Sequence, residues 1–254
     1  MKKETEKEKD SAFAEGTLSV LTILKTESRK IEKVFYSIDK DLDSERVARR
    51  IAGICRARGI PFERCDSEFI DENTTSSTHG GMIALVGERK TVPLEALLDK
   101  KDGFLFLLDG VEDPYNFAYS IRSMYAAGAD GMILTPRNWM SAAGVCIRGS
   151  AGASEMLDCA VCSDKSELVR LAKSRGWRIV CAHEKTDILH TDPVLKKPLL
   201  LIVGGEKRGI SKELVDSADC LVKIDYAREF NMSLTASAAA SVLAFEVASQ
   251  NKKG

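Results

Sequence analysis

The sequence predicts an α/β protein built around a parallel sheet, on two observations. Short apolar runs recur along the second half of the chain, and the clearest is FLFLL at 104–108, which ends at Asp109-Gly110. A continuous apolar run of this length is typical of a strand buried on both faces of a parallel sheet. Segments with helical periodicity separate the runs, as crossover connections between parallel strands require.

The second half of the chain, residues 104–254, is expected to form one parallel-sheet domain. Its expected strands are 104–108, 131–134, 178–182, 199–203 and 221–224. Its expected helices are 119–127, 165–175 and an alanine-rich helix that begins near Ser233 and ends at Gln250. Residues 91–103 are expected to be a linker or a connecting helix.

The first half predicts a smaller α/β domain over residues 13–90. Its expected elements are helices at 18–24 and 44–58 and strands at 31–38, 61–65 and 82–86. Ser44 is expected to be the N-cap of the second helix, and Gly59 its C-cap glycine. Residues 1–12 are almost all charged or small, which indicates a disordered tail.

The composition indicates a globular protein of the cytoplasm that binds neither membrane nor metal. Hydrophobic residues make up 44% of the 254 positions, and no apolar run approaches the ~20 residues that span a bilayer. No apolar stretch follows the basic N-terminus, as a secretory signal would require. The seven scattered cysteines predict reduced thiols, and Cys159-x-x-Cys162 lacks a good second ligand pair for zinc.

The charge balance excludes a broadly basic surface, because 37 basic residues face 38 acidic ones. A surface for nucleic acid must therefore come from local clusters. The densest cluster comprises Arg46, Arg49, Arg50, Arg56 and Arg58. By itself this cluster indicates no more than the solvated face of a helix.

Two loops are expected at the carboxyl ends of buried strands, where open parallel sheets bind ligands. After FLFLL, Asp113-Pro114 breaks the chain, so we expect Asn116 to cap a helix and Arg122 to face the same crevice. After the run LLLIV, Gly204-Gly205-Glu206-x-x-Gly209 matches neither G-x-G-x-x-G nor a P-loop. This glycine loop predicts a nucleoside or phosphate ligand or, equally, a plain tight turn.

These strings resemble the SpoU, or TrmH-like, family of RNA 2′-O-ribose methyltransferases in the SPOUT class. The family's first motif, D-P-x-N-x-G with a later arginine, is matched at Asp113, Pro114, Asn116 and Arg122, with Ala118 in place of the glycine. The second, G-x-E-x-x-G-[IL]-S, is matched from Gly204 to Ser211. The third, I-P-M followed by S-L-N-V-S-V-A, corresponds to Ile224-Asp225-Tyr226 and the segment 233–239, with Thr235 in place of the asparagine.

The resemblance implies a fold and an activity. Residues 104–254 would carry a C-terminal trefoil knot and pair with a second copy as a homodimer. Residues 16–88 more weakly resemble a ribosomal-protein-like substrate domain, which His79-Gly80-Gly81 would close. The expected reaction is methylation of a ribose 2′-hydroxyl by S-adenosylmethionine, with ribosomal RNA favoured over transfer RNA as the substrate.

The resemblance also implies the site residues. Cofactor binding is expected at Gly204, Gly205, Gly209, Ile224 and Leu234. Catalytic roles are expected for Asn116, Arg122, Glu206, Ser233 and Thr235. Because an arginine guanidinium stays protonated at neutral pH, we expect Arg122 to contact the RNA phosphate and the 2′-oxygen, with Asn116 and Glu206 orienting it.

Three alternatives remain at this stage. The RNA could be a transfer RNA, since the sequence does not name the substrate. The departures at Ala118 and Thr235 leave open a degenerate relative that binds RNA without catalysis. A conventional nucleotide-dependent α/β enzyme is disfavoured by the glycine spacing. Binding of S-adenosylmethionine distinguishes the methyltransferase from the other classes.

Overall fold

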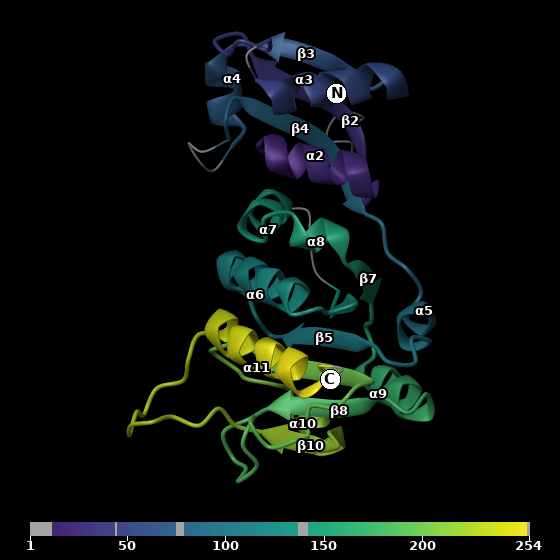
Figure 1. The fold of residues 1–254 in the computed structure, drawn as a ribbon, viewed down its shortest axis with the longest axis vertical. Helices are drawn as coiled ribbons and strands as arrows, with labels where there is room; N and C mark the ends of the chain where they lie inside the picture. Colours follow the sequence, from purple (N-terminus) through teal and green to yellow (C-terminus); the bar gives the residue numbers. More distant parts are fainter. Residues whose placement is uncertain (1–11, 44, 75–78, 137–141, 253–254) are drawn as a thin grey trace, which may run out of the picture. The chain divides into compact units, whose positions relative to one another are not determined.

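The computed structural model describes residues 12–43, 45–74, 79–136 and 142–252, which form two compact units (Figure 1). The first unit contains the described residues up to Lys90 together with 142–156. The second contains 91–136 and 157–252. The units differ from the expected domains in the segment 142–156, because its Ala143 and Ile147 pack in the core of the first unit.

The first unit is built on a four-stranded sheet with the order β1-β4-β2-β3. Its strands are β1 (Ala12–Glu15), β2 (Arg29–Ser37), β3 (Phe62–Cys65) and β4 (Met82–Arg89). Its helices are α2 (Thr17–Thr26), α3 (Arg46–Arg58), α4 (Ser67–Glu72), α7 (Ala143–Gly149) and α8 (Ala153–Met156). Strand β4 pairs antiparallel with β1 and β2, whereas β2 and β3 are parallel.

Buried ion pairs attach 142–156 to the rest of the first unit. Arg148 lies 2.7 Å from the buried carboxylate of Glu15. Glu155, also buried, accepts hydrogen bonds from the Ser28 hydroxyl at 2.6 Å and from Arg29 at 3.1 Å. A buried carboxylate without such partners would be strongly destabilising, so these pairs fix the position of α7 and α8.

The second unit is a six-stranded sheet with the order β10-β8-β9-β5-β6-β7, and every pairing in it is parallel. Its strands are β5 (Phe104–Asp109), β6 (Gly131–Leu134), β7 (Asp158–Val161), β8 (Arg178–Ala182), β9 (Leu199–Gly204) and β10 (Cys220–Val222). The central strands β5 and β9 are buried almost throughout, which confirms the expectation of a parallel α/β sheet.

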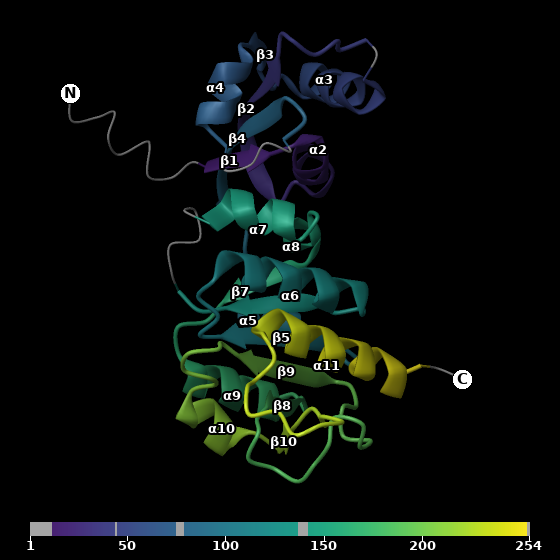
Figure 2. The same cartoon turned by 90° about the vertical axis from the view of Figure 1, so that its left-hand side faces the viewer.

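Helices cover this sheet on both faces. They are α5 (Leu94–Leu98), α6 (Pro114–Ala126), α9 (Lys165–Ser174), α10 (Lys212–Ser217) and α11 (Ala236–Gln250). Leucines of α5, α9 and α10 share one core with Leu105, Leu200 and Ile202 of the central strands. Helices α6 and α11 lie side by side (Figures 1 and 2) and are joined by a 2.6 Å hydrogen bond between the Ser123 and Ser241 hydroxyls.

Several expected boundaries need correction. Helix α6 begins at Pro114, and its N-cap is Asp113, which accepts the Asn116 N–H; Asn116 therefore lies inside the helix and does not cap it. Helix α11 begins at Ala236, after an N-cap at Thr235, and not near Ser233. Ser44 and residues 1–11 lie outside the described residues, but Ala12, expected in the tail, already belongs to β1.

Other features of the described residues agree with the sequence. Gly59 ends α3 with φ of 66°, the left-handed conformation expected of a C-cap glycine. All seven cysteines are free thiols. In the described part of the chain, none of the helices combines the length and the apolar character needed to cross a membrane.

Candidate active site

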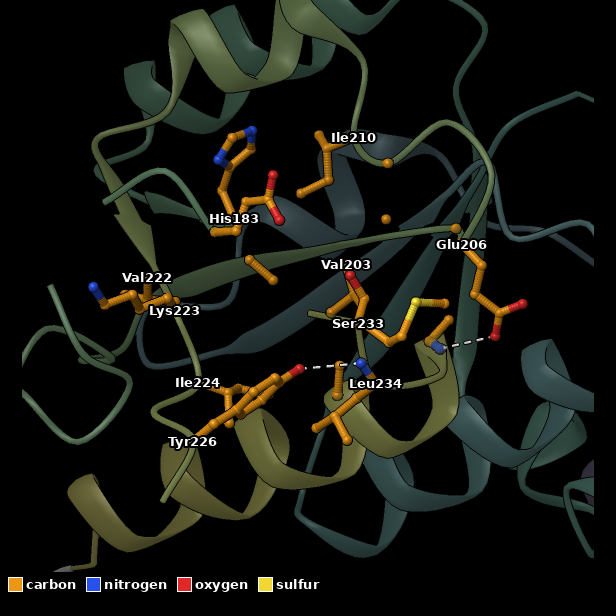
Figure 3. A pocket seen from close by; sticks show the side chains of 18 of the residues that line it. His183, Val203, Glu206, Ile210, Val222, Lys223, Ile224, Tyr226, Ser233 and Leu234 are labelled. Carbon is orange, nitrogen blue, oxygen red and sulfur yellow. Dashed lines mark hydrogen bonds between the residues drawn. The ribbon is translucent and has the colours of Figure 1, made fainter. Parts of the chain in front are cut away.

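A cavity of about 850 Å³ opens at the carboxyl ends of the neighbouring strands β10, β8 and β9 (Figure 3). Its apolar wall includes Val203, Ile210, Val222, Ile224 and Leu234. Charged and polar side chains line other parts of it, namely His183, Glu184, Glu206, Arg208, Lys223 and Asp225. Its position is the one that open parallel sheets use for ligands, and its size suits a nucleoside-sized molecule.

The glycine loop forms one wall of the cavity and is held by close backbone contacts. A Cβ on Gly205 would lie 2.0 Å from the Gly110 carbonyl oxygen, and one on Gly204 would lie 2.6 Å from the Gly209 and Ile210 backbone. Gly209 has φ of 62°, which favours glycine. The loop therefore needs its glycines to fold against β5 and against itself, independently of any ligand.

A partly buried ion pair supports this wall. The Lys165 ammonium donates to Asp109 Oδ1 at 2.7 Å and to the Ser211 hydroxyl at 2.9 Å. The other oxygen of Asp109 accepts the Ser211 N–H at 2.8 Å. Asp109 ends β5, Lys165 begins α9 and Ser211 ends the glycine loop, so the cluster ties three elements together.

Asn116 and Glu206 meet beside the cavity. The Asn116 amide donates to Glu206 Oε1 at 2.9 Å, and its oxygen accepts the Ser237 hydroxyl at 2.8 Å. Glu206 Oε1 also accepts the Ala236 N–H at 3.3 Å (Figure 3). It thereby gives a partner to one of the N–H groups at the start of α11, which have none within the helix. These bonds link the first, second and third sequence motifs in one network.

The third motif forms the opposite wall of the cavity. Ser233 and Leu234 line the cavity, and the Leu234 N–H donates to the Tyr226 hydroxyl at 3.1 Å (Figure 3). Thr235 is the N-cap of α11, and its hydroxyl accepts the Ala238 N–H at 3.2 Å. A threonine at the expected asparagine position thus has a local role, because hydroxyl side chains cap helices well.

Arg122 is separated from the other expected catalytic residues. It is exposed on α6 and is not among the residues that line the cavity. Six residues at about 100° each carry Arg122 about 240° around the helix axis from Asn116. Because Asn116 faces Glu206 and Ser237, Arg122 leaves α6 on a different side from Asn116, and its expected place in the same crevice stays a prediction.

Four residues of this region were not expected from the sequence: Asp109, Lys165, Tyr226 and Ser237. Asp109 and Lys165 are 56 positions apart, and only the sheet topology brings them together. The signal available in the sequence was an aspartate directly after an apolar run, and the structure shows that it is buried. Ser237 lies within the third motif, but its contact with Asn116 depends on how α11 packs against α6.

Thiols near the site are poor candidates for chemistry. Burial raises the pKa of Cys181 to about 12, and the nearby charge of Asp109 adds to the effect. Burial also raises the pKa of Cys162 in the C-x-x-C. Among the described residues, no cluster of three or more His, Cys, Asp or Glu side chains could hold a metal ion.

Comparison with known protein families decides the identity of the fold. The model described as the SpoU rRNA Methylase family matches residues 103–245, more than half of the chain. The chain belongs to this family. A second model, described as RNA 2′-O ribose methyltransferase substrate binding, matches residues 13–92. The chain is accordingly an RNA 2′-O-ribose methyltransferase with S-adenosylmethionine as its methyl donor, which confirms the resemblance.

Individual relatives agree with this assignment. The 23S rRNA (guanosine-2′-O-)-methyltransferase RlmB of Photobacterium profundum is 26% identical over 93% of this chain and 97% of the relative. RlmB of Pectobacterium atrosepticum is 29% identical over 92% of this chain and 96% of the relative. The fold is similar to that of an AdoMet-bound rRNA methyltransferase from Sinorhizobium meliloti, with a TM-score of 0.82, 24% identity and coverage of 99% and 92% of the two chains.

Proposed function

We propose that the chain methylates the 2′-hydroxyl of a guanosine in 23S ribosomal RNA. The observation that carries the proposal is the cavity at the strand ends, which residues of the second and third motifs line and to which Asn116 of the first is bonded through Glu206. Relatives named RlmB, aligned over more than nine tenths of the chain, support the choice of RNA.

The cavity fits S-adenosylmethionine in size and in chemistry. Val203, Ile210, Ile224 and Leu234 offer apolar surface for the adenine ring, and the Gly204-Gly205 backbone carries no side chain that would block close approach. The polar and charged residues His183, Glu184, Lys223 and Asp225 provide partners for an amino acid group. When bound, the cofactor supplies a methyl group on a positively charged sulfur.

The residues of the chain contribute mainly alignment and exclusion of water, because methyl transfer is an in-line displacement at the methyl carbon on the sulfonium. The Asn116–Glu206–Ser237 network fixes the start of α11 and with it Ser233 and Leu234 at the cavity. The exposed Arg122 guanidinium would bind an RNA phosphate next to the target ribose. In that position it also stabilises the negative charge that develops on the 2′-oxygen.

Two measurements test this function. Isothermal calorimetry should detect binding of S-adenosylmethionine, and 23S rRNA transcribed in vitro should accept a labelled methyl group at one guanosine ribose. An Arg122→Ala variant should keep the cofactor affinity and lose methylation at least about a hundredfold, the scale of one lost transition-state contact. Methylation of transfer RNA instead would favour the second candidate function, that of a transfer RNA methyltransferase. One relative, from Staphylococcus haemolyticus, is named as a putative TrmH family tRNA/rRNA methyltransferase.

A trefoil knot in the second unit is part of the proposal. The segment between β8 and β9 holds the end of α11, since Gln250 donates to the His190 and Asp192 carbonyls at 3.1 and 2.9 Å. Gln250 also accepts the Leu195 N–H at 3.0 Å. These contacts support threading of the C-terminal chain through that segment. An experimental structure in which the path of the chain is unknotted, so that pulling both termini would straighten it completely, would contradict the knot.

Homodimerisation through α6 and α11 is also part of the proposal. Large apolar side chains are exposed on both helices, namely Tyr115, Tyr119, Tyr125, Val242 and Phe245. Exposed apolar surface on adjacent helices is typical of protein interfaces. Sedimentation should give a dimer, and Phe245→Glu should give a monomer. We further propose that the enzyme acts in the cytoplasm, where the proposed substrate would be made.

A further inference from the structure

Helix α3 in the first unit exposes four arginines on one face. Arg46, Arg49, Arg50 and Arg56 are all exposed, whereas Ala48, Ile51 and Cys55 of the same helix are buried. At about 100° per residue, the four arginines fall within one side of the helix. The face extends over about 15 Å, at 1.5 Å per residue.

Two small residues lie in the middle of this face. Gly53 and Ala57 share the direction of the four arginines. A Cβ on Gly53 would meet no atom within 4 Å, so no packing inside the protein requires a glycine there. Glycine in a helix interior is destabilising relative to alanine. The α3 arginine face (the four arginines around Gly53 and Ala57) therefore keeps a glycine that the fold does not need.

The four arginines have no partners among the described residues. None of their guanidinium groups forms an ion pair or a hydrogen bond with another described residue. The acidic residues Asp41, Asp43 and Glu45 precede the helix. Arg58, on the same helix, is different, because it donates to the Leu24 carbonyl at 2.7 Å and pairs with Glu27 at 3.2 Å. Arg58 stabilises the fold, whereas the other four present unpaired charge to solvent.

We propose that the α3 arginine face binds the phosphate backbone of the RNA substrate, with the strand passing over Gly53 and Ala57. This inference rests on the proposed function, because it takes RNA as the substrate. Arginine is the side chain best suited to phosphate oxygens, and small residues between arginines let a phosphate chain approach the helix. The face lacks the large apolar residues that a membrane-binding helix or a protein-docking helix would present.

Phosphate contacts on this face bind without reading sequence. Such contacts fix the position of the nucleic acid and contribute affinity, whereas base contacts carry specificity. The face is therefore a positioning surface in the first unit, and the choice of nucleotide belongs to other residues. It also explains how a chain with a net charge of −1 holds a polyanion, since its positive charge is concentrated locally.

The charge test compares Arg49→Gln/Arg50→Gln with Arg170→Gln/Lys173→Gln, which removes two exposed cations from α9 in the second unit. Binding of labelled, in vitro transcribed 23S rRNA is measured between about 50 and 200 mM salt. The α3 variant should bind roughly tenfold more weakly, and the slope of log affinity against log salt should fall by about 1.5. The α9 variant should match the wild type in both.

The shape test is Gly53→Leu, which changes no charge and replaces glycine by a strong helix former. The variant should unfold at a higher temperature than the wild type and bind the RNA several-fold more weakly, with an unchanged salt slope. Unchanged RNA affinity in both α3 variants would overturn the inference while leaving the proposed function intact. If the wild-type protein binds S-adenosylmethionine but no RNA, the proposed function fails as well.

Discussion

The two walls of the cavity are organised differently. The glycine loop packs at the end of β5 through backbone contacts and is supported by the partly buried Asp109–Lys165 pair, and the strand β9 that precedes it is buried. The opposite wall, residues 225–235, is exposed apart from partly buried Leu234, and Phe230 and Met232 expose 59% and 68% of their surface. Its anchors include the Tyr226–Leu234 bond, the ring contact of Tyr226 with Phe230 and the Thr235 cap.

This difference implies a division of roles. A wall fixed by buried contacts is formed before a ligand arrives, which lowers the entropic cost of binding. A wall with few anchors opens locally at small free-energy cost, which suits a segment that must admit cofactor and RNA. The variants below test whether damage to the first wall is more costly than damage to the second.

The largest effect is expected for Gly205→Ala. Its Cβ would meet the Gly110 carbonyl oxygen at 2.0 Å, and a backbone atom cannot move aside without shifting β5 or the loop. We expect a loss of roughly 2–4 kcal/mol in unfolding free energy and no measurable cofactor binding. Urea denaturation and calorimetry check both. Gly209→Asn is the control, since asparagine tolerates its positive φ and its site is open.

Asp109→Asn is expected to have the next largest effect. It leaves the Lys165 ammonium, with 25% of its side chain exposed, without its carboxylate partner. The cost should be about 1–3 kcal/mol, because part of the lysine can still be hydrated. The double variant Asp109→Asn/Lys165→Met should recover part of that loss. A single variant as stable as the wild type would show that the pair does not support the glycine loop.

The pH dependence of stability should depend on the buried thiol of Cys181, which lies in β8 near Asp109. The folded protein keeps the Cys181 thiol protonated up to its raised pKa of about 12, while the unfolded chain releases that proton near its ordinary value of 9.0. Stability from this thiol is thus complete below pH 9.0 and falls as pH rises toward 12, by at most about 1.4 kcal/mol per pH unit. Chemical denaturation of the Cys181→Ala variant should show a shallower decline.

The smallest effect is expected for Tyr226→Phe in the second wall. It removes one exposed hydrogen bond, to the Leu234 N–H, and leaves the ring contact with Phe230. Unfolding free energy should change by less than about 0.5 kcal/mol, and cofactor affinity should fall about two- to fivefold. Tyr125→Phe, another exposed tyrosine, should change neither quantity. A large loss of stability would show that this wall is as fixed as the first.

The sequence predicted the features that local chemistry determines. The apolar runs identified β5, β6, β8 and β9, because a strand buried on both faces must be apolar throughout. The glycine spacing identified the loop at 204–209, and Gly59 marked the end of α3. The motif residues Glu206 and Asn116 were expected beside the site and do meet there.

Non-local packing determined what the sequence did not predict. The six-residue separation puts Arg122 about 240° around α6 from Asn116 whichever residue caps the helix, and which side then faces the cavity depends on how α6 packs against α11. The placement of 142–156 depends on Glu155 pairing with Arg29, 126 positions away. A carboxylate near the middle of the chain gives no sign of such a partner, because nothing in its neighbours indicates burial.

The placement of 142–156 also determines how the protein can be divided. The chain enters the first unit, leaves it after Lys90, returns for α7 and α8, and leaves again after Met156. A gene fragment that stops at Lys90 would encode a unit without Ala143 and Ile147 in its core and with Glu15 deprived of Arg148. The two halves therefore cannot be exchanged between homologous genes at a single junction, and any chimera must carry residues 142–156 along with its N-terminal donor.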